Sequence, residues 1–98
     1  MIDLDFLKGQ QLEVFSTRTC PDCTRLDQLF AARGVQAKKI YIDSDEAAAK
    51  TLEQGAGKRA VPYIRVNGED WVRGYHIDQP GRLKEALLWD ELRAVIEA

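Results

Sequence analysis

The chain has 98 residues, of which 45% are hydrophobic and 31% charged, a mixture typical of a globular protein rather than a disordered segment. This length suits a single domain, residues 1–98, with one modest core. The formal net charge of -2 argues against nucleic-acid binding, and no apolar run approaches the roughly 18 residues of a membrane span. We therefore expect a monomer that binds neither nucleic acid nor membrane.

The N-terminal residues 1–7 include acidic side chains where a secretion signal has basic ones. We therefore expect a cytoplasmic protein. Residues 12–15 then form a short apolar run that predicts a strand, and from Pro21 to Arg33 the apolar residues follow a helical period. Pro21 suits the first turn of that helix, and Gly34 suits its end.

The next segments predict a second strand and a second helix. Residues 37–42 end in β-forming side chains, and residues 47–54 are helix-forming sequence preceded by capping side chains at 43–45. Residues 55–59, which contain Gly55 and Gly57, are predicted to form a flexible loop.

The last third of the chain predicts two strands and a helix. Residues 61–66 form a third strand with Pro62 at its start, and Asn67-Gly68 is a strong hairpin signal that leads into a strand around residues 71–73. Asp78 is placed to cap a final helix with Pro80 in its first turn. The apolar residues of this helix are Leu83, Leu87, Trp89, Leu92, Val95 and Ile96.

The predicted order is β-α-β-α-β-β-α. A strand, helix and strand in succession imply a right-handed parallel crossover, and the Asn67-Gly68 turn makes the last pair antiparallel. The sequence therefore predicts an α/β fold with a mixed four-stranded sheet and helices on both of its faces.

The chain has two cysteines, Cys20 and Cys23, with two residues between them. A disulfide that closes so short a loop adds little stability, so the pair indicates chemistry rather than structural cross-linking. A structural zinc site needs four ligands, and the chain offers no third cysteine and one histidine, His76. We therefore expect no metal site.

Cys20 lies between a predicted strand and the N-terminus of a predicted helix. Unpaired backbone N–H groups and the helix dipole favour a thiolate there, which lowers the pKa of a thiol from its free value of about 8.5. Arg18 is a candidate cation that adds to this effect, and the carboxylate of Asp22 opposes it. We expect Cys20 to attack a disulfide and Cys23, one turn further along the helix, to resolve the mixed disulfide.

Four short segments of the sequence together match a known pattern: Phe15 with the polar turn after it, Cys20-Pro21-Asp22-Cys23, Val61-Pro62, and Gly74-Tyr75. In these segments the chain resembles the glutaredoxins, whose fold is thioredoxin-like. The resemblance spans about residues 11–88, so residues 1–10 form an N-terminal extension outside it. It implies an enzyme, a thiol–disulfide oxidoreductase that reduces protein disulfides or glutathione mixed disulfides and holds no cofactor tightly.

The resemblance also implies a site for glutathione and for extended substrates. Pro62 would be a cis-proline beside the dithiol, and the backbone of Val61 would pair with the substrate. Lys58 and Arg59 match the basic residues that hold a glutathione carboxylate in that family. The residues expected to bind substrate or glutathione are Arg18, Pro21, Asp22, Lys58, Arg59, Val61, Pro62, Arg73, Gly74, Tyr75 and Asp78.

Two departures from the glutaredoxin pattern leave the reductant open. Asp22 stands where dithiol glutaredoxins usually carry tyrosine, and Arg73-Gly74 stands where they carry Gly-Gly. Residues 71–78 resemble more closely the glutaredoxin-like redoxins that reduce ribonucleotide reductase, and such a redoxin would take electrons from a thioredoxin reductase. An alternative of another class is an iron–sulfur cluster or metal-binding protein that uses Cys20 as a ligand.

Overall fold

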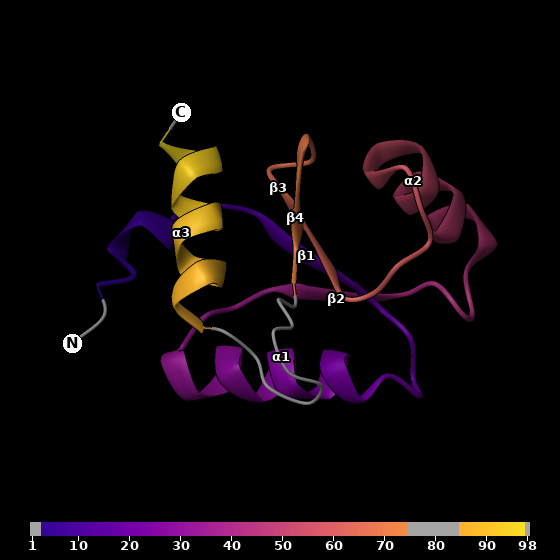
Figure 1. Cartoon of the computed structure of the whole chain (residues 1–98), viewed down its shortest axis with the longest axis horizontal. Coiled ribbons are helices and arrows are strands. Elements are labelled where there is room, and N and C mark those ends of the chain that lie inside the picture. The colour runs from indigo at the N-terminus through magenta and orange to yellow at the C-terminus, as the bar shows by residue number, and fades with distance from the viewer. Residues whose placement is uncertain (1–2, 75–84, 98) are drawn as a thin grey trace.

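The computed structural model describes residues 3–74 and 85–97, in which a mixed four-stranded sheet is flanked by three α-helices (Figure 1). The predicted α/β class and order of elements are confirmed. In the described residues, no helix is both long and apolar enough to cross a membrane. The elements are η1 (Asp5–Leu7), β1 (Leu12–Ser16), α1 (Pro21–Arg33), β2 (Lys38–Tyr41), α2 (Glu46–Ala56), β3 (Tyr63–Val66), β4 (Asp70–Arg73) and α3 (Glu85–Ile96).

The strands lie in the order β2-β1-β3-β4. β1 is parallel to β2 and antiparallel to β3, and β3 is antiparallel to β4. Phe15, near the end of β1, pairs with Tyr63, the first residue of β3. The loop that leads from β1 to Cys20 and the segment that carries Pro62 into β3 therefore meet at the same end of the two central strands.

One face of the sheet packs against α1 and α3. Side chains alternate between the two faces of a strand, so Val14, Ile64 and Val72 point to the same side. The rings of Phe30 in α1 and Trp89 in α3 stack with 5.9 Å between their centroids. The core on this face consists of Leu7, Leu12, Val14, Leu26, Phe30, Ile64, Val66, Val72, Leu88, Trp89 and Leu92.

The other face of the sheet carries α2, which lies to the right of the strands in Figure 1. Gly55 of this helix lies directly against Trp71, where a methyl group on Gly55 would overlap the indole. Trp71 also contacts Phe15, with 5.0 Å between the ring centroids. The lack of a side chain at position 55 thus allows α2 to reach β4.

Gly55 and Ala56 belong to α2, so the prediction of a flexible loop over residues 55–59 was wrong at its start. The helix ends at Gly57, which has φ 83° and donates its N–H to the carbonyl of Glu53 at 2.9 Å. Glycine is a poor helix former, but the packing of Gly55 on Trp71 outweighs its propensity. A positive φ at the residue after a helix is a common way to end it.

Two further expectations need correction, one about the start of β3 and one about the buried face of α3. β3 begins at Tyr63 rather than at residue 61. Leu87 is 43% exposed, because Leu88 and Leu92, one turn apart, form the inner stripe of α3 together with Trp89. The predicted helix start at Asp78 and Pro80, and Leu83 after it, lie outside the described residues.

The predicted hairpin turn at Asn67-Gly68 is confirmed. Asn67 has φ 53° and Gly68 has φ 74°, the pair of positive φ angles that a tight hairpin between twisted strands requires. The Asn67 side chain accepts a hydrogen bond from the backbone N–H of Gln11 at 2.8 Å. This bond ties the turn to the start of β1.

A cross-strand ion pair lies on the α2 face. Nε of Arg65 donates to Oε1 of Glu13 at 2.8 Å, and the two side chains are 23% and 20% exposed. The guanidinium also lies over the Phe15 ring, 5.3 Å from its centroid. The hydrogen bond from Arg65 lowers the pKa of the Glu13 carboxyl below its ordinary value.

We expect Glu13→Gln to lower the free energy of unfolding at neutral pH and to have little effect in acid. Since the pKa of Glu13 is lower in the folded state, its stabilisation is complete above the ordinary value of 4.5 and is lost as the pH falls through the folded value. Urea denaturation of both proteins at several pH values measures the difference. A difference that is constant over pH would contradict the assignment. Glu97→Gln, at an exposed ion pair with Arg93, is the matched control.

Candidate active site

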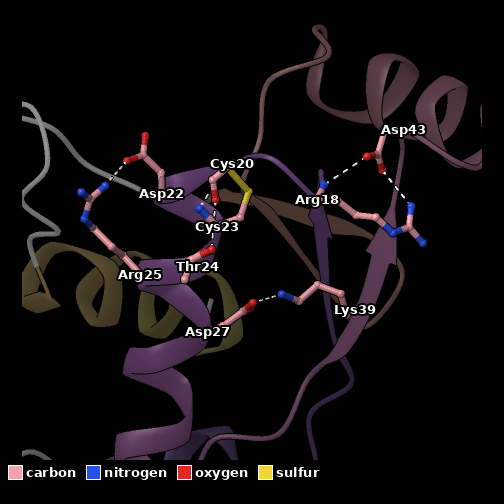
Figure 2. The surroundings of a disulfide bond; sticks show 9 residues. All are labelled: Arg18, Cys20, Asp22, Cys23, Thr24, Arg25, Asp27, Lys39 and Asp43. Carbon is pink, nitrogen blue, oxygen red and sulfur yellow. Dashed lines mark hydrogen bonds and ion pairs between the residues drawn. A yellow bond between two sulfur atoms is a disulfide. The ribbon is translucent and has the colours of Figure 1, made fainter.

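Cys20 and Cys23 form a disulfide at the N-terminus of α1 (Figure 2). Cys20 is the N-cap residue, and its Sγ accepts a hydrogen bond from the backbone N–H of Cys23 at 3.0 Å. Pro21 occupies the first helical position, where a missing N–H leaves nothing unsatisfied. The sulfur of Cys20 therefore lies where N–H groups and the helix dipole stabilise a negative charge.

The two sulfurs differ in their access to solvent. Cys23 is 2% exposed, whereas Cys20 is half-buried and the neighbouring Pro21 is exposed. In disulfide exchange the attacking sulfur must be reached by a partner, and the resolving sulfur needs to reach only the first. The arrangement suits an accessible nucleophile at position 20 and a protected second thiol at position 23.

The Val61–Pro62 peptide bond is cis, as the family resemblance implied. Pro62 is fully buried, and its carbonyl accepts a hydrogen bond from the N–H of Gly74 at 3.0 Å. A Cβ on Gly74 would lie 2.9 Å from Cδ2 of Leu26 and 3.1 Å from the carbonyl oxygen of Pro62. Leu26 follows Cys23 by one helical turn, so Gly74 joins the start of β3 to the first turns of α1.

Arg18 binds a loop carboxylate rather than the dithiol. Its Nη1 donates to Oγ of Ser44 at 2.9 Å and lies 3.4 Å from Oδ1 of Asp43, and its guanidinium covers the Tyr41 ring at 4.4 Å. Figure 2 shows the side chain extended away from the disulfide. The expectation that Arg18 supplies a cation to Cys20 therefore finds no support in this geometry.

Two further ion pairs flank the dithiol. Nη1 of Arg25 donates to Oδ1 of Asp22 at 2.9 Å, and Lys39 on β2 pairs with Asp27 on α1 (Figure 2). Burial of its ammonium lowers the pKa of Lys39. Sequence reasoning identified Asp22 but missed its partner Arg25, although a separation of three residues on a helix is a recognised signal of such a pair.

The basic residues assigned to glutathione differ in their surroundings. Arg59 donates to Glu53 at 2.6 Å and to Glu46 at 2.8 Å, so it is held against α2. Lys58 is exposed and has no ion-pair partner in the described part of the chain. Arg73 lies over the Tyr63 ring, 5.4 Å from its centroid. Tyr75 and Asp78, which the sequence analysis also assigned to this site, lie outside the described residues.

The family model of the glutaredoxins matches residues 12–71 of this chain. The chain belongs to the glutaredoxin family. Its members are thiol–disulfide oxidoreductases, and this glutaredoxin carries their pair of cysteines at Cys20 and Cys23.

Individual relatives agree with the family model. A probable glutaredoxin of Synechocystis sp. is 32% identical over 96 residues, which cover 86% of this chain and 87% of the relative. A glutaredoxin of Vernicia fordii is 31% identical and covers 81% of this chain and 82% of its own length.

Solved structures show the same thioredoxin-like fold. The crystal structure of a glutaredoxin from Archaeoglobus fulgidus aligns with a TM-score of 0.63 at 19% identity, over 100% of this chain and 98% of that one. The structure of a buckwheat glutaredoxin–glutathione complex aligns with a TM-score of 0.54 at 30% identity, over 65% of this chain and 61% of that one.

Gly74→Ala tests the contact between β4, Pro62 and α1. The added methyl group would push on Leu26 and on the Pro62 carbonyl, so we expect the free energy of unfolding to fall by about 1–3 kcal/mol, the usual cost of overpacking. Disulfide reductase activity falls with it, since the first turns of α1 must shift. Chemical denaturation and a reductase assay measure the two effects. Asp70→Ala, at the exposed first position of β4, the strand that precedes Gly74, is the control and leaves both near wild type. A fully stable and active Gly74→Ala protein would contradict this contact.

Proposed function

We propose that this glutaredoxin reduces protein disulfides and glutathione mixed disulfides by dithiol exchange, with Cys20 as the nucleophile and Cys23 as the resolving thiol. The observation that carries the proposal is the position of the Cys20 sulfur, which caps α1 and accepts the N–H of Cys23 at 3.0 Å. A thiolate formed at this sulfur keeps the same N–H donor. Since a hydrogen bond to a charged acceptor is stronger, this donor stabilises the thiolate of the reduced state.

The reaction starts from the reduced dithiol. The Cys20 thiolate attacks one sulfur of the substrate disulfide, the substrate S–S bond breaks, and the departing sulfur leaves as a thiolate that takes up a proton. The Cys23 thiol then loses its proton and attacks the Cys20 sulfur of the mixed disulfide. The second substrate sulfur leaves as a thiolate, and Cys20–Cys23 remains as the disulfide that the structure contains. Two electrons pass from the dithiol to the substrate.

An extended substrate segment is proposed to bind along Val61. This residue precedes Tyr63, where the pairing of β3 begins, so its backbone groups lie outside the sheet ladder. A free stretch of extended backbone can pair with another chain by strand addition. The cis bond to Pro62 and the position of Gly74 against that proline support this placement next to α1.

Glutathione is the proposed reductant. The solved buckwheat relative is a complex with glutathione, and the exposed ammonium of Lys58 supplies a charge for a glutathione carboxylate. Two glutathione molecules would return the Cys20–Cys23 disulfide to the dithiol and leave as one glutathione disulfide. The alternative, a redoxin that donates electrons to ribonucleotide reductase, would be reduced by a thioredoxin reductase instead.

Supplying the oxidised protein separately with glutathione and with thioredoxin reductase plus NADPH distinguishes the two reductants. We expect glutathione to restore the dithiol and the reductase to reduce the protein only slowly. Titration of the free thiols over time measures both reactions. The reverse preference would favour the redoxin alternative.

Cys20→Ser is expected to abolish all disulfide reduction, because the remaining sulfur, that of Cys23, is only 2% exposed. Cys23→Ser is expected to retain one-thiol reduction of a glutathione mixed disulfide and to accumulate a mixed disulfide with a protein substrate. A coupled reductase assay and mass spectrometry of the trapped species measure the two outcomes. If Cys23→Ser were inactive and Cys20→Ser active, the two roles would have to be exchanged.

Lys58→Gln is expected to raise the KM for a glutathione mixed disulfide by about twofold to fivefold with little change in kcat, as for the loss of one exposed charge contact. Arg59→Gln is the matched neighbour and is expected to leave the KM unchanged, since Arg59 is held by Glu46 and Glu53. Steady-state kinetics with the glutathione mixed disulfide measures the KM of both variants. An effect at Arg59 and none at Lys58 would reverse the assignment.

A further inference from the structure

Asp22 stands between the two cysteines in the sequence. It is the second residue of α1, in the first turn, directly after Pro21. Nη1 of Arg25 donates to its Oδ1 at 2.9 Å. The Arg25 side chain is 40% exposed and the Asp22 side chain 32%. In Figure 2 this pair lies on one flank of the disulfide, and Arg18 with Asp43 lies on the other.

A carboxylate in this position acts on the chemistry of Cys20. Two like charges close together disfavour each other, so an ionised Asp22 opposes the formation of a thiolate at the neighbouring helix cap. The same N-terminal N–H groups and dipole that favour the thiolate also favour the carboxylate, so the helix itself does not remove the conflict. A cation bound to the carboxylate reduces this repulsion, because its positive charge offsets the negative charge that the Cys20 sulfur would otherwise experience.

The other charged groups near the dithiol have partners of their own. Arg18 is bound by Asp43 and Ser44, and Lys39 pairs with Asp27. The Thr24 hydroxyl donates to the Cys20 carbonyl at 3.3 Å and carries no charge. Within residues 3–74 and 85–97, the cation that contacts Asp22 is therefore Arg25.

We propose that Arg25 is a positioning residue for disulfide exchange. It acts through Asp22, whose carboxylate it neutralises, and so favours the thiolate form of Cys20. The proposal rests on the proposed function, in which Cys20 is the nucleophile. Arg25 makes no contact with the reacting sulfurs in this mechanism. Its effect is a change in the fraction of Cys20 that is ionised at a given pH.

The test is the pH dependence of iodoacetamide alkylation of Cys20 in the fully reduced chain, with the modified cysteine identified by mass spectrometry. Arg25→Gln leaves Asp22 unpaired, so the alkylation profile should move to higher pH. At a pH below the thiol pKa, the rate should fall by about threefold to tenfold, because the thiolate fraction changes about tenfold for each pKa unit. Arg25→Lys keeps the charge and should retain most of the rate.

The double variant Asp22→Asn with Arg25→Gln decides whether Arg25 acts through Asp22. Removal of both charges should return the profile close to that of the wild type, and Asp22→Asn alone should not move it to higher pH. A double variant as slow as Arg25→Gln would overturn the proposal, because Arg25 would then act directly on the thiolate. An Arg25→Gln profile identical to the wild type would overturn it as well.

Arg33→Gln is the matched control. It removes one positive charge from the same helix at its opposite end, where Arg33 is bound to Glu85 at 2.6 Å, and should leave the Cys20 profile unchanged. An equal shift in Arg33→Gln would show a general charge effect and overturn the proposal. Failure of the proposed function looks different, since in that case the wild-type protein itself would be alkylated first at Cys23 or at neither cysteine.

Discussion

The hydrogen bond between the Cys23 N–H and the Cys20 sulfur is the interaction on which the active site depends. It requires a cysteine at the N-cap of the helix, whose sulfur faces the unpaired backbone N–H groups of the first turn. A second cysteine at position 23, in that first turn, brings the resolving sulfur within bonding distance of the first. Pro21 lacks an N–H in the first turn, where the helix provides no acceptor for it. The redox chemistry and the start of α1 are thus one structural feature.

The rest of the fold holds that helix end against the sheet through close backbone approaches. Gly74 lies against Pro62 and Leu26 at a distance that a methyl group would not allow. On the opposite face, Gly55 permits α2 to lie against Trp71. Both glycines have ordinary φ angles, so space and not backbone conformation explains them. A larger residue at position 74 would displace Pro62, which leads into the central strand β3.

The charged residues around the dithiol are arranged as local pairs. Arg25 with Asp22, Lys39 with Asp27, and Arg18 with Asp43 each join a cation to a carboxylate within or between neighbouring elements. Pairs that are partly exposed add little stability. Of the three, only Arg25 with Asp22 involves a residue of the Cys20–Cys23 segment itself. Lys58 differs from them because its ammonium is exposed near the start of the Val61 segment.

The sequence by itself determined the features that depend on neighbouring residues. The bounds of the first helix, the Asn67-Gly68 turn, the order of the elements and the dithiol at a helix N-terminus all follow from local preferences of proline, glycine, asparagine and apolar periodicity. The cis bond before Pro62 came from the family resemblance, since the same dipeptide elsewhere is usually trans.

Only the tertiary structure decided which groups meet across the chain. The strand order, the continuation of α2 through Gly55, and the binding of Arg18 by Asp43 and of Arg59 by Glu46 join residues that lie far apart in sequence or on different elements. A long charged side chain can reach several carboxylates, and local sequence does not rank them. The choice is made when the sheet and helices pack, because packing brings certain carboxylates within hydrogen-bonding distance, as it brings Glu46 and Glu53 to Arg59, and leaves others out of reach.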